Sequence, residues 1–586
     1  MSTGNRLGNA WSDDDHRDDF NFSFNHDRDF LFFGGDWGHH DHNDDHGFHI
    51  EVQGNQWVLT NGHHTEAITG DSVVLHGETY LLVDQFGGGY QSIQAAVDAA
   101  HTGATVLVAS GTYAEQVSVV GSGKDGLTIE AADDNNVTIT APATLVKTAD
   151  AANTGRDMVG LVTVDSADHV TIKDVTVDGD HRGADVPAGD SPTLVGVAYV
   201  NSDGGVIDHV DVTGIRESDA SFGDQRGVGI YVTNDDPSPA LPHTPSAAEA
   251  ASLNSIEIKH STVEDFQKGG IVVSYADVDI HDNTVTGHGG TPLTAQNGIQ
   301  VANSTGSIED NDISAIGYTG GSNAAASGIL TFQNRDLVVE DNTIAGSGQS
   351  DSVTGIFDID SVGGHITGNT ISNVLFAIDA EDYPTASGWP DPLLPGGPHE
   401  HNFDFSGNDV SSVYAGMWFQ PDAATTDTFN VTGTSADDAI FGAANDDVLN
   451  GGKGSDYLSG GAGNDKLTGG LGGDELAGGP GNDTFVFADV ADSKPGAGNF
   501  DTIDDFTAGD KIDLSAIDAN TQHHGDQDFG FVAAQTAGVQ AYKVTWHQDT
   551  VNNQTIVQAD NNGNAVADVE IHLAGLQTLT AGNFIL

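Results

Sequence analysis

The 586-residue chain contains no cysteine, and this absence excludes disulfides, thiolate catalysis and Cys-ligated zinc. Basic residues are scarce as well: 18 Lys and Arg stand against 87 Asp and Glu, which gives a formal net charge of −69. A surface this acidic repels phosphate and anionic lipid, so no nucleic-acid partner is expected. No apolar run approaches the roughly 18–20 residues of a membrane-spanning helix, so membrane insertion is not expected either.

The acidic excess itself favours a bound divalent cation. Folding packs like charges together, and their repulsion opposes compaction unless something neutralises them. Calcium is the usual extracellular cation for sites built from oxygen ligands. The alternative is a surface that is acidic only for solubility, and the positions of the acidic residues must distinguish the two.

The N-terminal region divides into two parts. Residues 1–48 are rich in Asp, His and Phe and lack the basic and apolar regions of a secretory signal peptide, so we expect a disordered Asp/His-rich arm. His-rich tracts can also bind zinc or nickel. Short apolar runs punctuated by Gly54, Gly62, Gly70 and Gly77 predict a small β segment over residues 49–83.

A loose repeat extends over residues 84–420. It opens with one short amphipathic helix, in which Ile93, Val97 and Ala100 share a face. The repeat then has two markers that advance in step, a Gly followed by a bulky apolar residue and a conspicuous Asn. The Asn residues are Asn283, Asn311, Asn342, Asn369 and Asn408. A unit of about 22–30 residues with short strands and no helix predicts one rung of a parallel β-helix.

The same segment resembles the right-handed β-helix superfamily of pectate lyases, polygalacturonases, pectin methylesterases, and alginate lyases and epimerases. The resemblance rests on the rung pattern and on the helix over 91–97 followed by the sequence GTYAE at 111–115. Mannuronan epimerases carry an Asp-Pro-His-Glu motif, and this chain has Pro398-His399-Glu400 with Gly397 in place of the Asp. The resemblance implies the fold and leaves the chemistry open.

Candidates for chemistry on the β-helix come from its rare basic residues. Lyases and epimerases of uronic-acid polymers must neutralise the substrate carboxylate and remove the C5 proton, which calls for a cation and a base. The candidate catalytic residues are Arg216, Arg226, Lys268 and His399. The alternative is that these basic groups pair with local acids, namely Glu217, Asp224 and Asp265.

Residues 433–486 form six consecutive nine-residue frames. The sixth position is always Asp and the eighth is always apolar. This pattern resembles the calcium-binding nonapeptide of RTX (hemolysin-type) proteins, which folds into a parallel β-roll. The resemblance implies Ca²⁺ as the cofactor. The predicted carboxylate ligands are Asp438, Asp447, Asp456, Asp465, Asp474 and Asp483. The predicted carbonyl ligands belong to Gly452, Gly454, Gly461, Gly463, Gly470, Gly472, Gly479 and Gly481.

Two frames make one coil of such a roll, so frames two apart should stack. Asp438, Asp456 and Asp474 are then expected along one edge, with the other three Asp residues along the opposite edge. The first two frames lack the second and fourth Gly, so we expect them to bind calcium weakly. Without calcium the Asp residues should repel one another and keep the segment unfolded.

The remaining boundaries follow from these modules. Residues 421–432 are expected to be a linker, and residues 487–586 a cap of the roll that ends in a type I secretion signal. The C-terminal tail of small, hydroxyl and apolar residues is similar to such signals, although an ordinary final β-strand explains it too. The resemblance implies an extracellular protein whose partner during export is the type I secretion apparatus.

The sequence therefore predicts an all-β protein, a right-handed parallel β-helix followed by a calcium-binding parallel β-roll of the RTX type. The order of these modules is similar to that of mannuronan C5-epimerases. One hypothesis is a secreted protein whose β-helix binds or acts on an acidic polysaccharide, as a lyase or epimerase. The other is a non-catalytic matrix, surface-layer or adhesive protein with a calcium-dependent fold.

Overall fold

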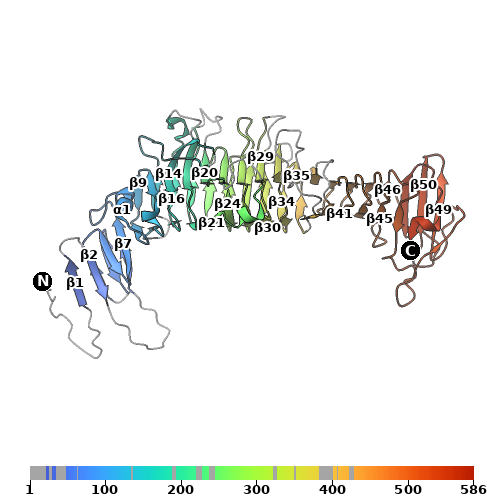
Figure 1. The fold of residues 1–586 in the computed structure, drawn as a ribbon, viewed down its shortest axis with the longest axis horizontal. Helices are drawn as coiled ribbons and strands as arrows, with labels where there is room; N and C mark the ends of the chain where they lie inside the picture. Colours follow the sequence, from blue (N-terminus) through green and yellow to red (C-terminus); the bar gives the residue numbers. More distant parts are fainter. Residues whose placement is uncertain are drawn as a thin grey trace, which may run out of the picture. The chain divides into compact units, whose positions relative to one another are not determined.

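The described part of the chain is almost entirely β structure in the computed structural model, and most of its strands are short, parallel and stacked in successive coils (Figure 1). The fold class predicted from the sequence is confirmed. The structure describes residues 21–25, 30–34, 48–61, 64–133, 136–152, 154–187, 193–218, 227–236, 244–320, 326–348, 352–359, 361–381, 400–405, 407–421 and 428–586. Among these residues, no helix is long and apolar enough to cross a membrane.

The chain divides into two compact units. The first comprises residues 1–237 and 253–286, and the second comprises residues 238–252 and 287–586. The first unit contains the N-terminal strands and the early rungs of the β-helix. The second contains the later rungs and the β-roll.

The N-terminal strands differ in part from the expected disordered arm. Within residues 1–48, β1 (Asn21–Asn25) and β2 (Phe30–Gly34) form an antiparallel pair, because both segments are rich in Phe and so have high β propensity. Most of the remaining predicted arm lies outside the described residues. Next come the antiparallel strands β3 (His49–Val52), β4 (Trp57–Thr60) and β5 (Thr65–Ala67), and then the hairpin of β6 (Ser72–Leu75) and β7 (Glu78–Val83).

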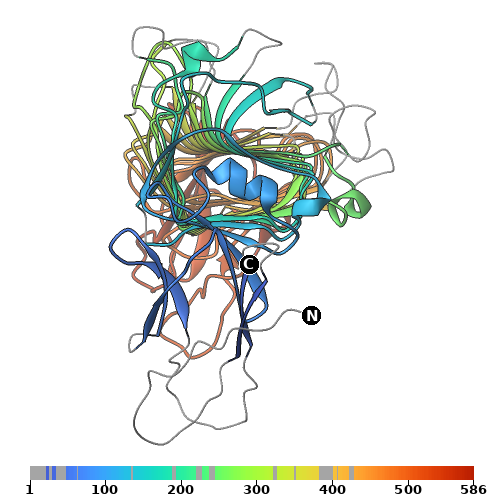
Figure 2. The same ribbon diagram turned by 90° about the vertical axis from the view of Figure 1, so that its left-hand side faces the viewer.

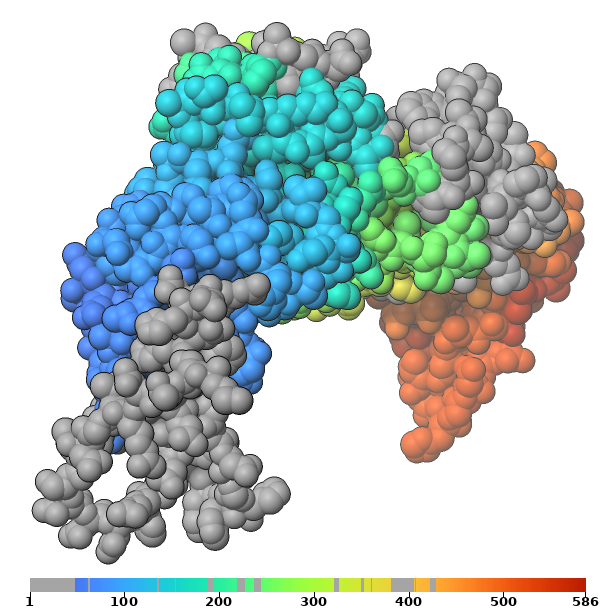
Figure 3. All heavy atoms as spheres, turned by 60° about the vertical axis from the view of Figure 1, so that its left-hand side comes forward, coloured from blue at the N-terminus to red at the C-terminus, as the bar shows by residue number. Residues whose placement is uncertain are grey.

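The predicted amphipathic helix is α1 (Ile93–Ala99), and it closes the start of the β-helix, as Figure 2 shows. The Glu115 carboxylate accepts the first free N–H groups of the helix, from Ile93 at 2.8 Å and Gln94 at 3.0 Å. At the other end the Lys124 ammonium donates to three C-terminal carbonyls. Both charges favour the helix dipole, so the cap is held electrostatically as well as by packing. In the space-filling view the blue residues of the cap adjoin the light-blue residues of the first rungs (Figure 3).

The rungs of the first unit consist of three short strands each, and every strand pairs in parallel with its equivalent one rung along. One sheet contains β8 (Thr105–Val108), β11 (Thr128–Ala131), β15 (Thr171–Lys173), β18 (Gly205–Asp208), β21 (Asn254–Lys259) and β24 (Ala276–His281). The second contains β10 (Val117–Val120), β14 (Asp157–Asp165), β17 (Thr193–Val200), β20 (Val228–Thr233) and β23 (Gly269–Ser274). The third contains β9 (Gly111–Ala114), β12 (Val137–Thr140), β16 (Thr176–Asp178), β19 (Asp211–Thr213), β22 (Thr262–Glu264) and β25 (Thr284–Thr286).

The second unit continues with the same rung plan. Its strands are β26 (Asn297–Ala302), β27 (Thr305–Glu309), β28 (Asp312–Ile316), β29 (Ala326–Phe332), β30 (Val338–Glu340), β31 (Thr343–Gly346), β32 (Val353–Ile359), β33 (His365–Thr367), β34 (Thr370–Ser372), β35 (Phe376–Glu381), β36 (Glu400–Asp404), β37 (Asp409–Ser411) and β38 (Ala415–Gln420).

Four of the repeated Asn residues form a buried ladder at one corner of the second unit's rungs, and they are Asn311, Asn342, Asn369 and Asn408. Asn342 is typical of the ladder. Its backbone N–H donates to Asn369 Oδ1 at 3.0 Å, and its side-chain amide donates to the carbonyls of Ile308 and Glu340 at 2.8 and 3.0 Å. Each Asn thus satisfies backbone groups that a corner leaves unpaired, which explains why the marker repeats once per rung.

The β-roll has two sheets of shorter strands. One contains β39 (Thr428–Thr432), β41 (Val448–Lys453), β43 (Lys466–Leu471), β45 (Thr484–Val486) and β47 (Lys511–Asp513). The other contains β40 (Ala439–Phe441), β42 (Tyr457–Ser459), β44 (Glu475–Ala477) and β46 (Asp501–Ile503). Strand β39 corrects the linker expected over 421–432. It pairs with β36 as well as β41, because Phe429 and Val431 alternate into the core.

The C-terminal segment packs on the end of the roll. Strands β49 (Lys543–Asp549), β50 (Gln554–Ala559) and β51 (Val569–Ala574) form an antiparallel meander, and β51 pairs with β46. Strand β48 (Gly530–Phe531) pairs with β49. The final strand β52 (Phe584–Ile585) pairs with β47, so the end of the chain is a strand of the roll sheet.

Candidate metal centre

The six Asp residues at the sixth position of the nonapeptides lie in two buried ladders. The backbone N–H of Asp438 donates to Asp456 Oδ1, and that of Asp456 donates to Asp474 Oδ1, both at 2.9 Å. Asp447, Asp465 and Asp483 repeat the arrangement on the other edge. Each step spans 18 residues, so frames two apart stack, as the nine-residue phase predicts.

The eighth position of every frame fills the core between the ladders. These side chains are all fully buried, and they are Ile440, Leu449, Leu458, Leu467, Leu476 and Phe485. Residues two apart in an extended segment point to the same face, so the Asp two residues before the apolar anchor is also directed inward. The core therefore fixes the position of the carboxylates.

Glycine is required where carbonyl oxygens line the turns. Gly470 has a φ of +102°, and a Cβ there would lie 2.1 Å from the Gly452 carbonyl oxygen. A Cβ on Gly461 would likewise lie 2.1 Å from the carbonyl oxygen of Ala443. The second position of the frame thus brings a carbonyl of one coil directly against the backbone of the next, which only Gly permits.

The complete frames leave one carboxylate oxygen of each Asp without a hydrogen bond. The Oδ2 atoms in question are buried, and they belong to Asp456, Asp465, Asp474 and Asp483. In the first two frames the second position is Thr434 or Ala443, whose N–H donates to Oδ2 of Asp438 at 2.6 Å or of Asp447 at 2.8 Å. The incomplete frames therefore satisfy their own carboxylates, whereas the complete frames hold an oxygen that lacks a partner.

The raised pKa values of the ladder carboxylates show that such an oxygen destabilises the charged form of the Asp side chain. Burial, together with the neighbouring Asp438, raises the pKa of Asp456 to about 9. Burial raises the pKa of Asp465 to about 7 and that of Asp474 to about 6. A buried carboxylate without a cation or enough hydrogen bonds is unstable in its charged form. The donor set is made of hard oxygen atoms, carboxylate and carbonyl, so it fits calcium.

Each ladder has one further Asp that the frame count did not include. Asp474 N–H donates to Asp501 Oδ1 at 3.1 Å, and Asp483 N–H donates to Asp510 Oδ1 at 3.0 Å. Asp501 Oδ2 is buried without a hydrogen-bond partner, and burial and the charge of Asp474 raise the pKa of Asp501 to about 9. The sequence does contain a signal for these two Asp residues. Asp501 and Asp510 are each followed two residues later by an Ile, which is the spacing between the Asp at position six and the apolar residue at position eight of a frame.

Of the four basic candidates on the β-helix, the structure describes Arg216 and Lys268. Arg216 is buried, and its Nε donates to Asp265 Oδ1 at 2.5 Å. This is the local pairing that the sequence offered as the alternative to catalysis. Lys268 is half-buried, and burial lowers the pKa of its ammonium group. Arg226 and His399 lie outside the described residues.

Sequence reasoning missed that His181 also belongs to this group. Its Nε2 lies 2.5 Å from Asp265 Oδ2, so the Asp265 carboxylate joins Arg216 and His181. Next to them, the buried Glu217 receives Gln267 Nε2 at 3.2 Å on its carboxylate. We call Arg216, Asp265, His181 and Glu217, together with Lys268 three residues after Asp265 in the chain, the basic cluster. The partners are 84 and 49 residues apart in the chain, so no local spacing could have indicated them.

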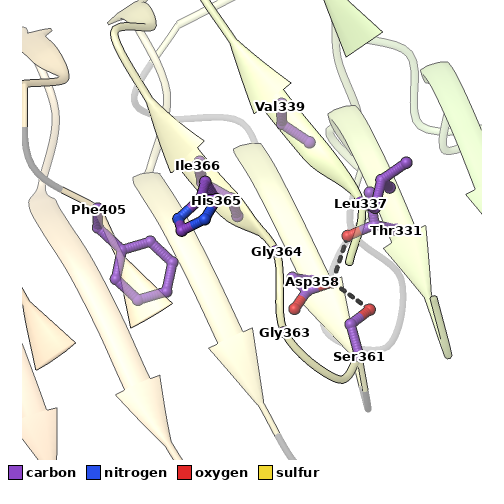
Figure 4. Close-up of a pocket in the computed structure, with 10 residues that line it drawn as sticks. All are labelled: Thr331, Leu337, Val339, Asp358, Ser361, Gly363, Gly364, His365, Ile366 and Phe405. Atoms are coloured by element: carbon purple, nitrogen blue, oxygen red, sulfur yellow. Dashed lines mark hydrogen bonds between the residues drawn. The ribbon is translucent and has the colours of Figure 1, made fainter. Parts of the chain in front are cut away.

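The second unit also contains a small cavity in its β-helix rungs (Figure 4). It has about 20 Å³ of free space, enough for roughly one water molecule. Asp358 lines it, and Thr331 and Ser361 both donate their hydroxyls to Asp358 Oδ1. The cavity is too small for a sugar, and its carboxylate is already hydrogen-bonded.

Two known protein families match the β-helix region and the C-terminal region of the chain. Residues 331–586 match the family of peptidase M10 serralysin C-terminal domains, and residues 248–386 match the right-handed β-helix region. No curated protein matches the chain.

Solved structures similar to the chain include modules of mannuronan C5-epimerases. The R3 subunit of an Azotobacter vinelandii mannuronan C5-epimerase is 34% identical, covers 26% of this chain and 78% of its own, and has a TM-score of 0.21. The A-module of another epimerase from that organism is 15% identical, with coverage of 72% and 90% and a TM-score of 0.25. Pectin methylesterase from carrot is 12% identical, with coverage of 60% and 88% and a TM-score of 0.30.

The two family matches agree with the architecture built from the residues. The repeat is of the calcium-binding type, and the serralysin-type domain is typical of proteins exported by type I secretion. The chain therefore has a C-terminal domain of the RTX serralysin type and a right-handed β-helix region.

Proposed function

We propose that the chain is a secreted calcium-binding protein whose β-helix binds or acts on an extracellular acidic polysaccharide. The observation that carries the calcium part is the buried Oδ2 atom without a hydrogen-bond partner, repeated in all four complete frames. The ligands would be these Asp carboxylates and the carbonyls of the turn glycines. Calcium there supplies positive charge to carboxylates that burial otherwise destabilises, and it prefers about six to eight oxygen ligands.

The Asp474→Asn substitution is expected to weaken calcium binding about tenfold, or about 1.4 kcal/mol, because it removes one charge and one free oxygen from a complete frame. The matched control is Asp438→Asn. The two side chains are equally buried, at 2% and 3% exposure, but the Asp438 oxygens are already satisfied by Thr434. We expect the control to change the calcium affinity less than about twofold, as measured by isothermal titration calorimetry. Equal losses for the two variants would contradict the proposal.

We infer that the chain is exported by a type I apparatus and functions outside the cell. The support is the serralysin-type C-terminal domain over residues 331–586. A chain that folds its roll only in calcium can cross a secretion channel unfolded and complete its fold outside.

The basic cluster supports the polysaccharide part of the proposal. A uronic-acid polymer is anionic, and cations are rare on this chain. The region where Arg216 and His181 meet Asp265, with Lys268 three residues further along the chain, is therefore a candidate surface for it. Burial lowers the pKa of Lys268, the direction that a lysine needs to act as a general base near neutral pH. Arg216 is a positioning residue in this scheme, because its guanidinium is held by Asp265.

Incubation of the calcium-loaded protein with alginate or polygalacturonate tests whether the β-helix acts on a uronic-acid polymer. Lyase action is expected as rising ultraviolet absorbance of unsaturated uronate, and epimerisation as a change in the proton NMR spectrum of the polymer. Lys268→Met is expected to lower either activity at least a hundredfold, in line with the loss of a general base. His101→Asn, an exposed change at a ring that contacts Thr102 and Thr79, is the control.

The second candidate function is a non-catalytic extracellular protein of the matrix, surface-layer or adhesive kind. The observation that favours it is that Arg216 is fully engaged in the fold, through Asp265 and the Glu217 carbonyl oxygen. No change in either polymer, together with calcium-dependent retention on an alginate column, would favour this function over the enzyme.

A further inference from the structure

Three histidines of the first unit lie at one corner of successive rungs, outside both sites described above. His209 follows β18, His260 follows β21, and His281 ends β24. The His209 and His260 rings stack with centroids 4.7 Å apart, the spacing of neighbouring strands. Both residues have left-handed backbone, with φ of +52° and +47°. The repeated corner conformation therefore places one imidazole on the next.

The two stacked rings share a carboxylate. Asp208 Oδ1 lies 2.7 Å from His209 Nδ1 and 3.0 Å from His260 Nδ1. The three ligand atoms all lie within 4.8 Å of one another. Tetrahedral zinc has bonds of about 2.0–2.1 Å to nitrogen and oxygen, so its ligand atoms lie a little over 3 Å apart. Small side-chain rotations would bring the three atoms to that spacing.

The other nitrogen of His260 has an acidic neighbour, which is the usual surrounding of a metal-binding imidazole. His260 Nε2 lies 3.8 Å from Asp282 Oδ2, and the same oxygen lies 2.8 Å from His281 Nδ1. At this distance the carboxylate acts electrostatically: it favours the proton on Nε2 of His260, which leaves Nδ1 free to bind a cation.

The net charge around the corner also favours a cation. Lys259 and Lys173 are close by, but each is neutralised by a glutamate, Glu257 at 2.6 Å and Glu130 at 2.7 Å. The three side chains are partly open to solvent, which leaves room for water to complete the coordination. His209, His260 and Asp208 have side-chain exposures of 52%, 43% and 24%.

We propose that Asp208, His209 and His260 form a binding site for a divalent transition metal such as zinc, separate from the calcium sites of the roll. Two imidazole nitrogens and one carboxylate select zinc, copper or nickel over calcium, which takes oxygen ligands. Asp282 positions His260 and does not bind the metal. Zinc binding needs no net proton loss from a neutral imidazole, because the Nδ1 proton can move to Nε2.

The test is a zinc titration of the full chain in saturating calcium, followed by calorimetry. The double variant His209→Asn/His260→Asn is the main change, since Asn tolerates the left-handed backbone that both positions require. We expect it to bind one zinc equivalent fewer than the unchanged chain. His-rich residues 1–48 are present in both proteins, so their contribution cancels in the comparison.

Two further variants make the result specific. Asp282→Asn is expected to keep the zinc stoichiometry and lower the affinity about 10–100-fold, the usual effect of losing a carboxylate that orients a ligand. His101→Asn, whose ring contacts Thr102 and Thr79 and no carboxylate, should change nothing. Equal zinc uptake by the unchanged and double-variant proteins would overturn the site. So would an equal loss with His101→Asn, or a fall in calcium equivalents in the double variant.

Discussion

Removal of calcium from the full chain is expected to unfold residues 433–513 and to leave the β-helix folded. This stretch contains 16 acidic and 4 basic residues, a net charge of −12, and its two Asp ladders are buried along the two edges of the roll. Without an ion, like charges 18 residues apart face each other across one strand spacing, so calcium-binding free energy becomes folding free energy. The β-helix has no such requirement, because its corners are satisfied by amides such as that of Asn342.

Far-ultraviolet circular dichroism with and without chelator measures the loss of β structure, and limited proteolysis shows which residues unfold. We expect new cleavage sites only beyond residue 432 after chelation. Calcium should restore the protected pattern and magnesium should not, since magnesium demands near-octahedral geometry and gives up its water reluctantly. Identical spectra and cleavage patterns in chelator and in calcium would show that the roll folds without the ion.

The sequence predicted the parts of the fold that repeat. Each rung of the β-helix must cover the apolar face of its neighbour, so Gly298 and Gly328 recur where a Cβ would strike the backbone of the next rung. The nine-residue phase likewise predicted which Asp residues stack, because two frames complete one coil. In both cases, residues at a fixed spacing in the sequence are also neighbours in the folded structure.

The parts that do not repeat could not be predicted in this way. Residues 487–500 interrupt the phase, so Asp501 lies 27 residues after Asp474 and was assigned to the cap, although it continues the ladder. Strand β39 was expected to be linker because only Phe429 and Val431 mark it. Asp265 meets His181 and Arg216 through rungs separated by loops of irregular length, and loop length hides such contacts from any fixed period.

Low pH is expected to fold the calcium-free roll. Burial, with like charge nearby, raises the pKa of Asp456 and Asp501 to about 9, and burial raises that of Asp438 to about 7. In the unfolded chain these groups titrate near their ordinary pKa of about 3.9. Between these values the folded roll binds more protons than the unfolded chain, so its stability falls as pH rises from about 4 to about 9.

The calcium-free chain should therefore show more β structure at about pH 5 than at about pH 8, by circular dichroism in chelator. Each pH unit over which one ladder Asp stays protonated only in the folded state is worth about 1.4 kcal/mol. With calcium present the direction reverses, because the ion competes with protons for the same oxygens and binds more tightly as pH rises.

Replacing ladder aspartates with asparagine distinguishes neutralisation of the ladders from the other effects of low pH on the protein. The double variant Asp456→Asn/Asp501→Asn mimics the protonated ladder, so without calcium it should be more folded at about pH 8 than the unchanged chain, although it binds calcium less well. Asp526→Asn, an exposed aspartate outside the ladders, should leave both properties unchanged. A double variant that is less folded than the unchanged chain in chelator would mean that the ladder carboxylates stabilise the roll by themselves. In that case calcium could not be what compensates their burial.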